Sequence, residues 1–214
     1  MINLDKLNRN EAKRYLGGAG IKLNDKMQAL MDECEKQILS NVSPKYLYSV
    51  IDLPCEEIIS GNDIKSHLDG CEKAVMMCAT LGNGVDRIIR IAQVADMSRA
   101  VVLDSFASVA VEQLCCKVDE LIAEKYPEYN MTFRFSPGYG DYPIEMQKYF
   151  LNRLDAPRKI GLTTNDNFLL MPAKSVTAVA GLSKSPIEKK KRGCTVCNLR
   201  ATCKFRRNGE HCGF

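Results

Sequence analysis

The chain has 214 residues, of which 45% are hydrophobic and 26% are charged, with ten cysteines and no tryptophan. This length and composition suffice for one sizeable domain with its own core, and no apolar run approaches the roughly 20 residues that cross a bilayer. The first six residues lack the pattern of a secretory signal, so the sequence predicts a soluble, cytoplasmic protein.

The net charge of +4 is divided unevenly along the chain. Residues 182–214 carry nine Lys or Arg and two acidic residues, a net charge of +7, whereas residues 1–181 carry 21 basic and 24 acidic residues, a net charge of −3. The sequence therefore predicts a body over 1–181, a basic linker over 182–192 and a cysteine-rich tail over 193–214. The six cysteines of the body lie in apolar segments and are expected to be free core thiols of a reducing compartment: Cys34, Cys55, Cys71, Cys78, Cys115 and Cys116.

The first part of the body alternates helical and β patterns. Asn8 and Glu11 resemble a capping box before a short helix that ends at Gly17-Gly18. The next predicted elements are a helix over 25–39, a strand over 46–51, a short helix over 62–69 and a strand over 74–79 that is buried on both faces.

Gly82-Asn83-Gly84 separates that strand from a helix that starts at Val85. A dinucleotide-binding loop would need a third glycine where Arg87 stands, and an acidic partner on a second strand. The motif is therefore predicted to be a plain turn.

The longest helical pattern covers residues 98–126 and stops before Pro127. Glu112 lies in its apolar middle. This carboxylate either faces solvent, which is the usual position of a single Glu on a helix, or points to a partner such as Arg134 or a ligand cation.

Residues 134–143 read Arg-Phe-Ser-Pro-Gly-Tyr-Gly-Asp-Tyr-Pro, between a β-rich run at 131–133 and a helical segment over 144–154. Two glycines and two prolines exclude a regular element and predict a stiff loop. Arg134 could bind a carboxylate with two hydrogen bonds, the tyrosines could cover a flat ring, and Gly138 could allow close backbone approach. A tight structural connection with an exposed arginine is the alternative.

The end of the body gives two β patterns, 167–171 and 175–180, joined by residues 172–174 and predicted to form a hairpin. The strands and helices of the body show no regular βαβ alternation. The predicted fold class is therefore α+β, with helices packed on a largely antiparallel twisted sheet.

The tail contains four cysteines within nineteen residues: Cys194, Cys197, Cys203 and Cys212. A polar segment this short cannot build a core, so a metal bound by the four thiolates would supply its folding energy. Zinc and an iron–sulfur cluster suit four sulfurs equally. A nucleic-acid-binding module built on the basic tail is the alternative from another class, but Phe205 and the terminal Phe214 are the tail's only aromatic side chains for base stacking.

Three segments carry a resemblance to a known family. Arg134-x-x-Pro137-Gly138-Tyr139-x-x-x-Pro143 resembles the S-adenosylmethionine-binding signature of the C-terminal reactivation (activation) domain of cobalamin-dependent methionine synthase. Pro172-x-x-Ser175-Val176 and Ala110-Val111-Glu112-Gln113 resemble two further segments of that domain, so that the resemblance covers roughly residues 70–182.

The resemblance implies an S-adenosylmethionine site and assigns no catalytic residue. Arg134 would hold the methionine carboxylate, Glu112 would face the cationic amino end, and Tyr139 would pack near the sulfonium or the adenine. The backbone at Gly138 would line the adenosyl group. The implied ligand contacts are Glu112, Arg134, Ser136, Pro137, Gly138, Tyr139 and Ser175.

The family uses this domain to remethylate oxidised cobalamin, with an electron from flavodoxin or a similar donor such as ferredoxin. This chain has only two histidines, His67 and His211, and no Asp-x-His motif for cobalamin. The resemblance therefore implies a methyltransferase-type component of methionine biosynthesis that acts only in complex with a corrinoid protein. That partner would be a separate methionine synthase, with another corrinoid methyltransferase or a corrinoid iron–sulfur protein as the alternative. The cysteine tail would dock the partner or, with iron–sulfur, relay the electron.

Overall fold

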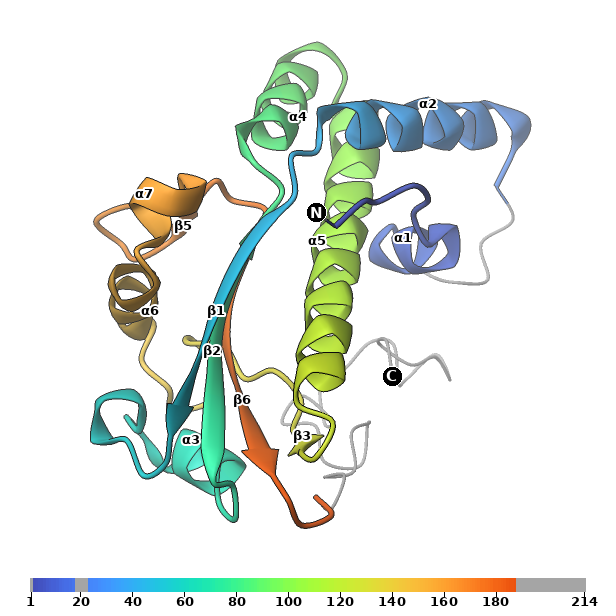
Figure 1. The fold of residues 1–214 in the computed structure, drawn as a ribbon. Helices are drawn as coiled ribbons and strands as arrows, with labels where there is room; N and C mark the ends of the chain where they lie inside the picture. Colours follow the sequence, from blue (N-terminus) through green and yellow to red (C-terminus); the bar gives the residue numbers. More distant parts are fainter. Residues whose placement is uncertain (1, 18–22, 188–214) are drawn as a thin grey trace, which may run out of the picture.

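The central strand β2 (Lys73–Thr80) organises the fold because its side chains are apolar toward both faces of the sheet. It pairs antiparallel with β1 (Lys45–Asp52) on one side and with β6 (Ser175–Ser183) on the other. The short β3 (Asn130–Met131) pairs with the end of β6, which gives the strand order β1-β2-β6-β3 (Figure 1).

The structure is a computed structural model that describes residues 2–17 and 23–187. Helices cover both faces of the antiparallel sheet (Figure 1), which confirms the expected α+β class. Among the described helices, none combines the length and the apolar character required to cross a membrane.

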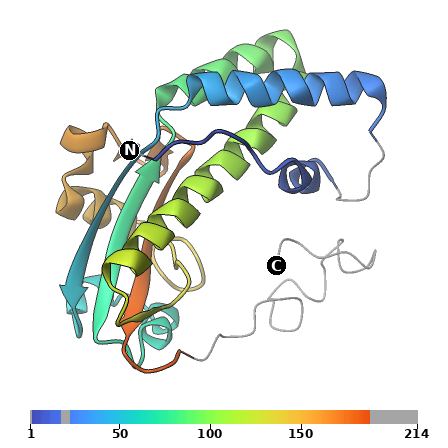
Figure 2. The same ribbon diagram turned by 45° about the vertical axis from the view of Figure 1, so that its right-hand side comes forward.

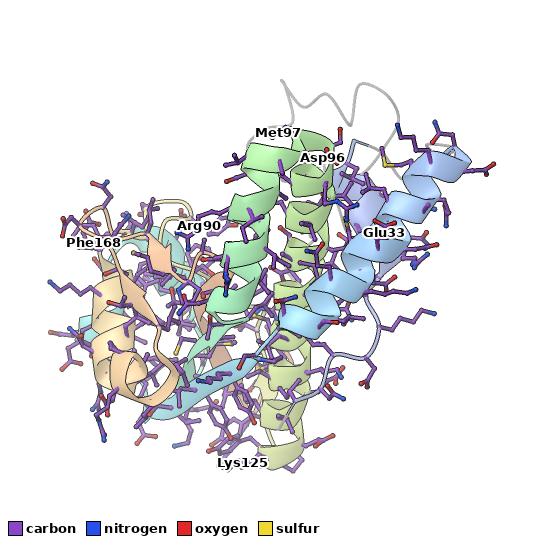
Figure 3. All side chains as sticks on the ribbon, turned by 90° about the horizontal axis from the view of Figure 1, so that it is seen from above. Glu33, Arg90, Asp96, Met97, Lys125 and Phe168 are labelled. Atoms are coloured by element: carbon purple, nitrogen blue, oxygen red, sulfur yellow. The ribbon has the colours of Figure 1, made fainter. Side chains whose placement is uncertain are left out.

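One face of the sheet is covered by α5 (Met97–Lys125), which crosses the strands obliquely (Figure 2). Phe106 and Leu114 of α5 are fully buried in the same core cluster as Met77 of β2. The outer layer on α5 consists of α1 (Arg9–Tyr15), α2 (Asp25–Asn41) and α4 (Asn83–Ala95). Figure 3 shows α4, α5 and α2 side by side from above.

The opposite face of the sheet is covered by shorter elements. Tyr142 and Phe150 pack there against Met76 of β2 and Val179 of β6. The elements of this side are the 3-10 helix η1 (Glu56–Ile58), α3 (Asn62–His67), α6 (Met146–Leu154), α7 (Ala156–Ile160), β4 (Thr163–Thr164) and β5 (Leu170–Met171).

The predicted hairpin between 167–171 and 175–180 is wrong. β5 pairs with β4, whereas β6 crosses into the main sheet and pairs with β2 and β3. The reason is burial: β6 is enclosed almost throughout, while Met171 of β5 is 52% exposed. β6 takes the position beside β2, where both of its faces leave water.

The predicted capping box is only half correct. The Asn8 side chain accepts hydrogen bonds from the backbone N–H groups of Asn10 and Glu11, as expected of a helix N-cap. Its own N–H donates to Gln113 Oε1 of α5 at 2.9 Å rather than to Glu11, which instead forms an ion pair with Arg14. A tertiary contact therefore replaces the local one.

The six cysteines of the body are free thiols, but they are not all in the core. Burial raises the pKa of Cys34 to about 11 and that of Cys78 to about 12, so both stay protonated and inert at neutral pH. Cys115 is also buried, Cys55 and Cys71 are partly buried, and Cys116 is exposed. The core prediction holds for three of the six.

Candidate S-adenosylmethionine site

Arg134 joins the loop after β3 to the middle of α5. Its Nη2 donates to Glu112 Oε2 at 2.8 Å, and its Nη1 contacts Asp119 Oδ2. The two acidic residues are seven positions apart, which places them two turns apart on one face of the helix. The structure thus decides the question of Glu112 in favour of a partner, although its side chain is still 52% exposed.

The side chain of Arg134 is only 18% exposed. Burial alone would lower the pKa of Arg134, but the charges of Asp119 and Glu112 outweigh it and the pKa is raised above its ordinary value. Arg134 is therefore a fixed cation between two carboxylates, and the three side chains carry a net charge of −1.

The loop that follows Arg134 is rigid through its own backbone. Gly138 has φ +92° and donates its N–H to the carbonyl of Tyr142 at 2.8 Å. The Ser136 carbonyl accepts a hydrogen bond from the N–H of Tyr139, and Pro137 is buried, so this turn is held in place by both contacts. The Tyr139 side chain is 67% exposed at the tip, where its ring can cover a ligand.

A reciprocal carboxylate clamp attaches the same loop to the start of α3. Asp141 accepts from the N–H groups of Asn62 and Asp63 at 2.7 and 2.9 Å, and its own N–H donates to Asp63 Oδ2 at 3.1 Å. The hydrogen bonds from the Asp63 and Asn62 backbone lower the pKa of Asp141. Gly140 faces this clamp with φ +56°. The clamp fixes the loop from the side opposite to Arg134.

An aromatic layer supports the loop on its inner side. Tyr142 is 1% exposed and its ring centre lies 6.0 Å from that of Phe135 and 6.5 Å from that of Phe150. Phe135 also stacks on His67, which lies 2.9 Å from Thr132 Oγ1. The only histidine in the described part of the chain thus packs against Phe135, next to the loop.

Tyr15, at the end of α1, lies at the candidate site, and the sequence analysis did not predict it there. Burial and the nearby charge of Glu112 raise the pKa of its hydroxyl, and Tyr139 acts in the same direction. Tyr15 is 53% exposed and lies close enough to Glu112 and to the exposed Tyr139 to feel the charges of both. The contact between α1 and the middle of α5 joins segments far apart in the sequence, and no local sequence pattern predicts it.

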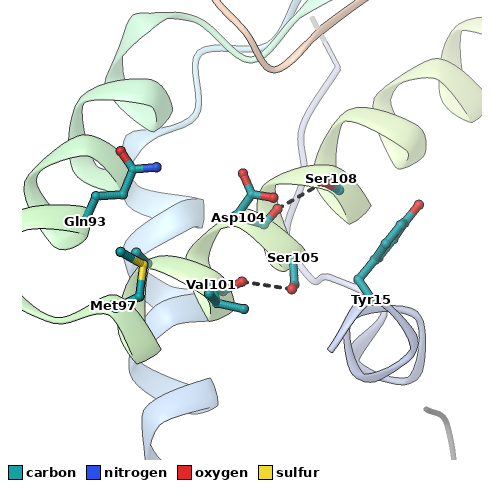
Figure 4. A pocket seen from close by; sticks show the side chains of 8 residues that line it. Tyr15, Gln93, Met97, Val101, Asp104, Ser105 and Ser108 are labelled. Atoms are coloured by element: carbon teal, nitrogen blue, oxygen red, sulfur yellow. Dashed lines mark hydrogen bonds between the residues drawn. The ribbon is translucent and has the colours of Figure 1, made fainter. Parts of the chain in front are cut away.

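Next to Tyr15 the surface of α5 is hollowed into an open cavity of about 270 Å³ (Figure 4). Tyr15 faces Ser105 and Ser108 across it, and Met97 and Val101 form its apolar end. Ser108 is one helical turn before Glu112. The cavity thus adjoins the carboxylate site along the helix.

Ser175 is the first residue of β6, whereas Arg134 lies beside the middle of this strand. Its hydroxyl contacts Thr80 Oγ1 at 2.8 Å and donates to the Pro172 carbonyl at 2.7 Å. Phe135, the neighbour of Arg134, bridges to Val179, four residues farther along the strand, or roughly 13 Å. The structure brings together Glu112, Arg134 and the 136–139 turn, and it places Ser175 apart from them; its ligand contact stays a prediction.

The four tail cysteines, Cys194, Cys197, Cys203 and Cys212, lie outside the described residues. Within residues 2–17 and 23–187, no group of three or more His, Cys, Asp or Glu side chains is arranged to hold a metal ion. The metal-binding tail therefore stays a prediction.

The arrangement of the four-stranded sheet and the long α5 is similar to that of a solved structure. A solved structure entitled "Crystal Structure of the MetH Reactivation Domain bound to AdoHcy" matches with a TM-score of 0.58 and 12% sequence identity, over 87% of this chain and 74% of that chain. At that identity the likeness establishes the fold and not the function. No protein-family model and no curated protein sequence matches the chain.

Proposed function

We propose that this chain binds S-adenosylmethionine at the Glu112–Arg134 site and presents its methyl group to a corrinoid held by a separate protein. The observation that carries the proposal is the contact between Glu112 and Arg134 beside the exposed tip at Tyr139. The same fold, in the MetH reactivation domain, was crystallised with AdoHcy bound.

The residues present fit such a ligand. An amino acid end needs a cation for its carboxylate and an anion for its ammonium group, and Arg134 and Glu112 supply both at one point. Tyr139 and Tyr15 are exposed enough to pack on a flat ring or a sulfonium. When bound, the ligand supplies an electrophilic methyl group, and the chain's own residues hold and orient it.

The proposed role is reductive reactivation of a corrinoid enzyme. The partner would supply the cobalt-containing corrinoid, and a flavodoxin- or ferredoxin-like donor would supply the electron. Methyl transfer from a sulfonium is strongly favourable, so it draws forward an unfavourable reduction that precedes it. A methionine synthase is the first candidate partner, and another corrinoid methyltransferase or a corrinoid iron–sulfur protein is the second.

The test is calorimetric titration of the full chain with S-adenosylmethionine. An Arg134→Ala, Glu112→Ala double variant should bind at least roughly tenfold more weakly, because two charge-assisted contacts are lost. A matched control, Arg158→Ala with Glu120→Ala, removes one cation and one anion from exposed positions and should bind normally.

No binding to the wild type, or undiminished binding to the double variant, would overturn the proposed site. If binding holds, the partner follows from mixing the loaded protein and a reductant with each inactive corrinoid protein and recording its absorption spectrum. Failure of every corrinoid protein to regain its methylated spectrum would argue against the reactivation role while leaving the binding site intact.

A further inference from the structure

The open cavity beside Tyr15 lies on the face of α5 that also carries Glu112. Two of its lining residues, Ser108 and Asp104, precede Glu112 by roughly 6 and 12 Å along the helix axis. Residues four positions apart share a helix face, so a ligand held at Glu112 can extend along α5 into the cavity. The cavity volume of about 270 Å³ is below the roughly 300 Å³ at which pockets for complete small molecules begin. The cavity therefore fits one part of an extended ligand.

Asp104 is a fixed carboxylate in the middle of this cavity. The Nζ of Lys174, a residue whose side chain is 16% exposed, lies 2.8 Å from Asp104 Oδ1 and donates to Ser108 Oγ at 2.9 Å. Ser108 donates its own proton to the Asp104 carbonyl (Figure 4). The Asp104 side chain is still 56% exposed, so its carboxylate can accept further hydrogen bonds. A carboxylate held in this way can bind the 2′-hydroxyl of a ribose, as in dinucleotide sites.

The end of the cavity away from Glu112 has the chemistry of a base site. Met97 and Val101 are 62% and 48% exposed and form an apolar surface there, on which a flat ring can leave water. Gln93 of α4 lines the same end, as Figure 4 shows. A glutamine amide can form two hydrogen bonds with the N6 and N7 atoms of adenine. The apolar surface and the amide together suit a purine.

We infer that this cavity binds the adenosine part of S-adenosylmethionine, so that the ligand lies along α5 with its amino acid end at Glu112 and its adenine at Met97. This inference rests on the proposed function. The ribose lies at Asp104, and the sulfonium lies beside the ring of Tyr15, where a cation is attracted to the aromatic face. The 136–139 turn then borders the methyl group rather than the adenosyl group.

Val101→Trp tests the inference, because an indole at this half-exposed position occupies the cavity without entering the core. In calorimetric titrations, affinity for S-adenosylmethionine should fall at least roughly tenfold, since the nucleoside loses its burial on α5. Val94→Trp is the matched control: it adds the same side chain to α4, at a position that is 92% exposed, and it should bind like the wild type. Undiminished affinity in Val101→Trp would overturn the inference and leave the proposed function standing, whereas a wild type that does not bind would overturn the proposed function itself.

The nucleoside 5′-methylthioadenosine, which has no amino acid end, decides between the cavity and the 136–139 turn. Its affinity should fall more in Val101→Trp than in Tyr139→Ala. The reverse order would place the adenosyl group at the turn and contradict the inference. A wild type that does not bind this nucleoside would also contradict a subsite with contacts of its own.

Should Val101→Trp fail to fold, Asp104→Asn decides, because the amide keeps the shape of the side chain and removes its charge. S-adenosylmethionine is compared with its 2′-deoxyadenosyl analogue, and the ratio of the two dissociation constants gives the preference for the ribose hydroxyl. A charge-assisted hydrogen bond is about twice as strong as a neutral one, so this preference should fall roughly three- to tenfold in Asp104→Asn. Glu120→Gln, on an exposed position of the same helix, should keep the wild-type ratio. An unchanged ratio in Asp104→Asn, even with both ligands weakened, would show a purely structural role for Asp104 and overturn the inference.

Discussion

Gly140 has a backbone conformation and a neighbour that both exclude a side chain. Its φ is +56°, and a Cβ there would lie 2.0 Å from Asp63 Oδ2. Asp63 cannot simply turn away, because this oxygen accepts the Asp141 N–H that closes the clamp. Gly140→Ala is expected to lower the free energy of unfolding by about 2 kcal/mol, from backbone strain and a lost clamp bond together.

The control for that prediction is Gly161→Ala. Gly161 has φ +71°, but nothing lies within 4 Å of the position of its Cβ. Only the backbone strain remains, which costs about 1 kcal/mol. Urea unfolding of the two variants measures the difference. Equal losses of stability would show that the clamp at Asp63 and Asp141 contributes little to holding the loop.

The identity of the site residues could be predicted only in part from the sequence. The order and spacing of the residue types in 134–143 predict Arg134 and the 136–139 turn as candidate site residues. No such pattern marks Asp119, because a single Asp on a long helix is ordinarily solvated. The signal was present nevertheless: Glu112 and Asp119 share one helix face, and a face with two acids beside an apolar core predicts a cation opposite.

At the scale of the elements, α1 depends on tertiary contacts. The segment before it is attached to α5 by Gln113, whose Oε1 accepts from the Asn8 N–H at 2.9 Å and whose Nε2 donates to the Lys6 carbonyl at 3.0 Å. Leu4 and Leu7 are buried in the main core beside these bonds. A seven-residue helix is not stable alone, so α1 stays in place through this attachment.

Gln113→Ala should therefore loosen α1 without unfolding the body. Two hydrogen bonds are lost, which costs about 1 to 2 kcal/mol of local stability, and backbone amides of residues 8–15 should exchange hydrogen faster. Because Tyr15 sits at the end of α1, affinity for S-adenosylmethionine should also fall, by roughly two- to fivefold. Hydrogen exchange with mass spectrometry and calorimetry measure both effects.

Glu120→Ala serves as the control, since it changes an exposed residue of the same helix. Its exchange pattern and its affinity should match the wild type. Normal exchange over residues 8–15 in Gln113→Ala would show that the buried leucines and the ion pairs of Arg9 with Asp32 and Glu35 suffice to hold α1, which would contradict the structural role of Gln113.

For the whole molecule, local patterns predicted the elements better than their pairing. The 3.6-residue period of 98–126 and the continuous apolar run of 74–79 are local patterns. In each segment the order of apolar side chains by itself predicts which of them become buried. The pairing of β6 with β2 brings together residues about a hundred positions apart. Which of two apolar segments enters the sheet depends on the competition between them, and neither segment's own sequence predicts the outcome.

The charge division between body and tail leads to a prediction for the whole chain. Among the described residues, the main core cluster runs from Leu4 to Leu182 and already encloses α5 and one face of the sheet. A chain shortened after Ile187 should therefore keep its fold and its affinity for S-adenosylmethionine. It should also lose whatever metal the full chain binds, because the described residues offer no metal-ligand cluster.

Metal analysis and absorption spectra of both chains, purified without oxygen, check this prediction. Visible absorption in the full chain alone would place an iron–sulfur cluster in the tail and support electron relay. A colourless full chain with one bound zinc would leave docking of the partner as the role of the tail. Loss of S-adenosylmethionine binding in the shortened chain would contradict the division, since the tail would then complete a site that Arg134, Glu112 and Tyr139 were expected to form on their own.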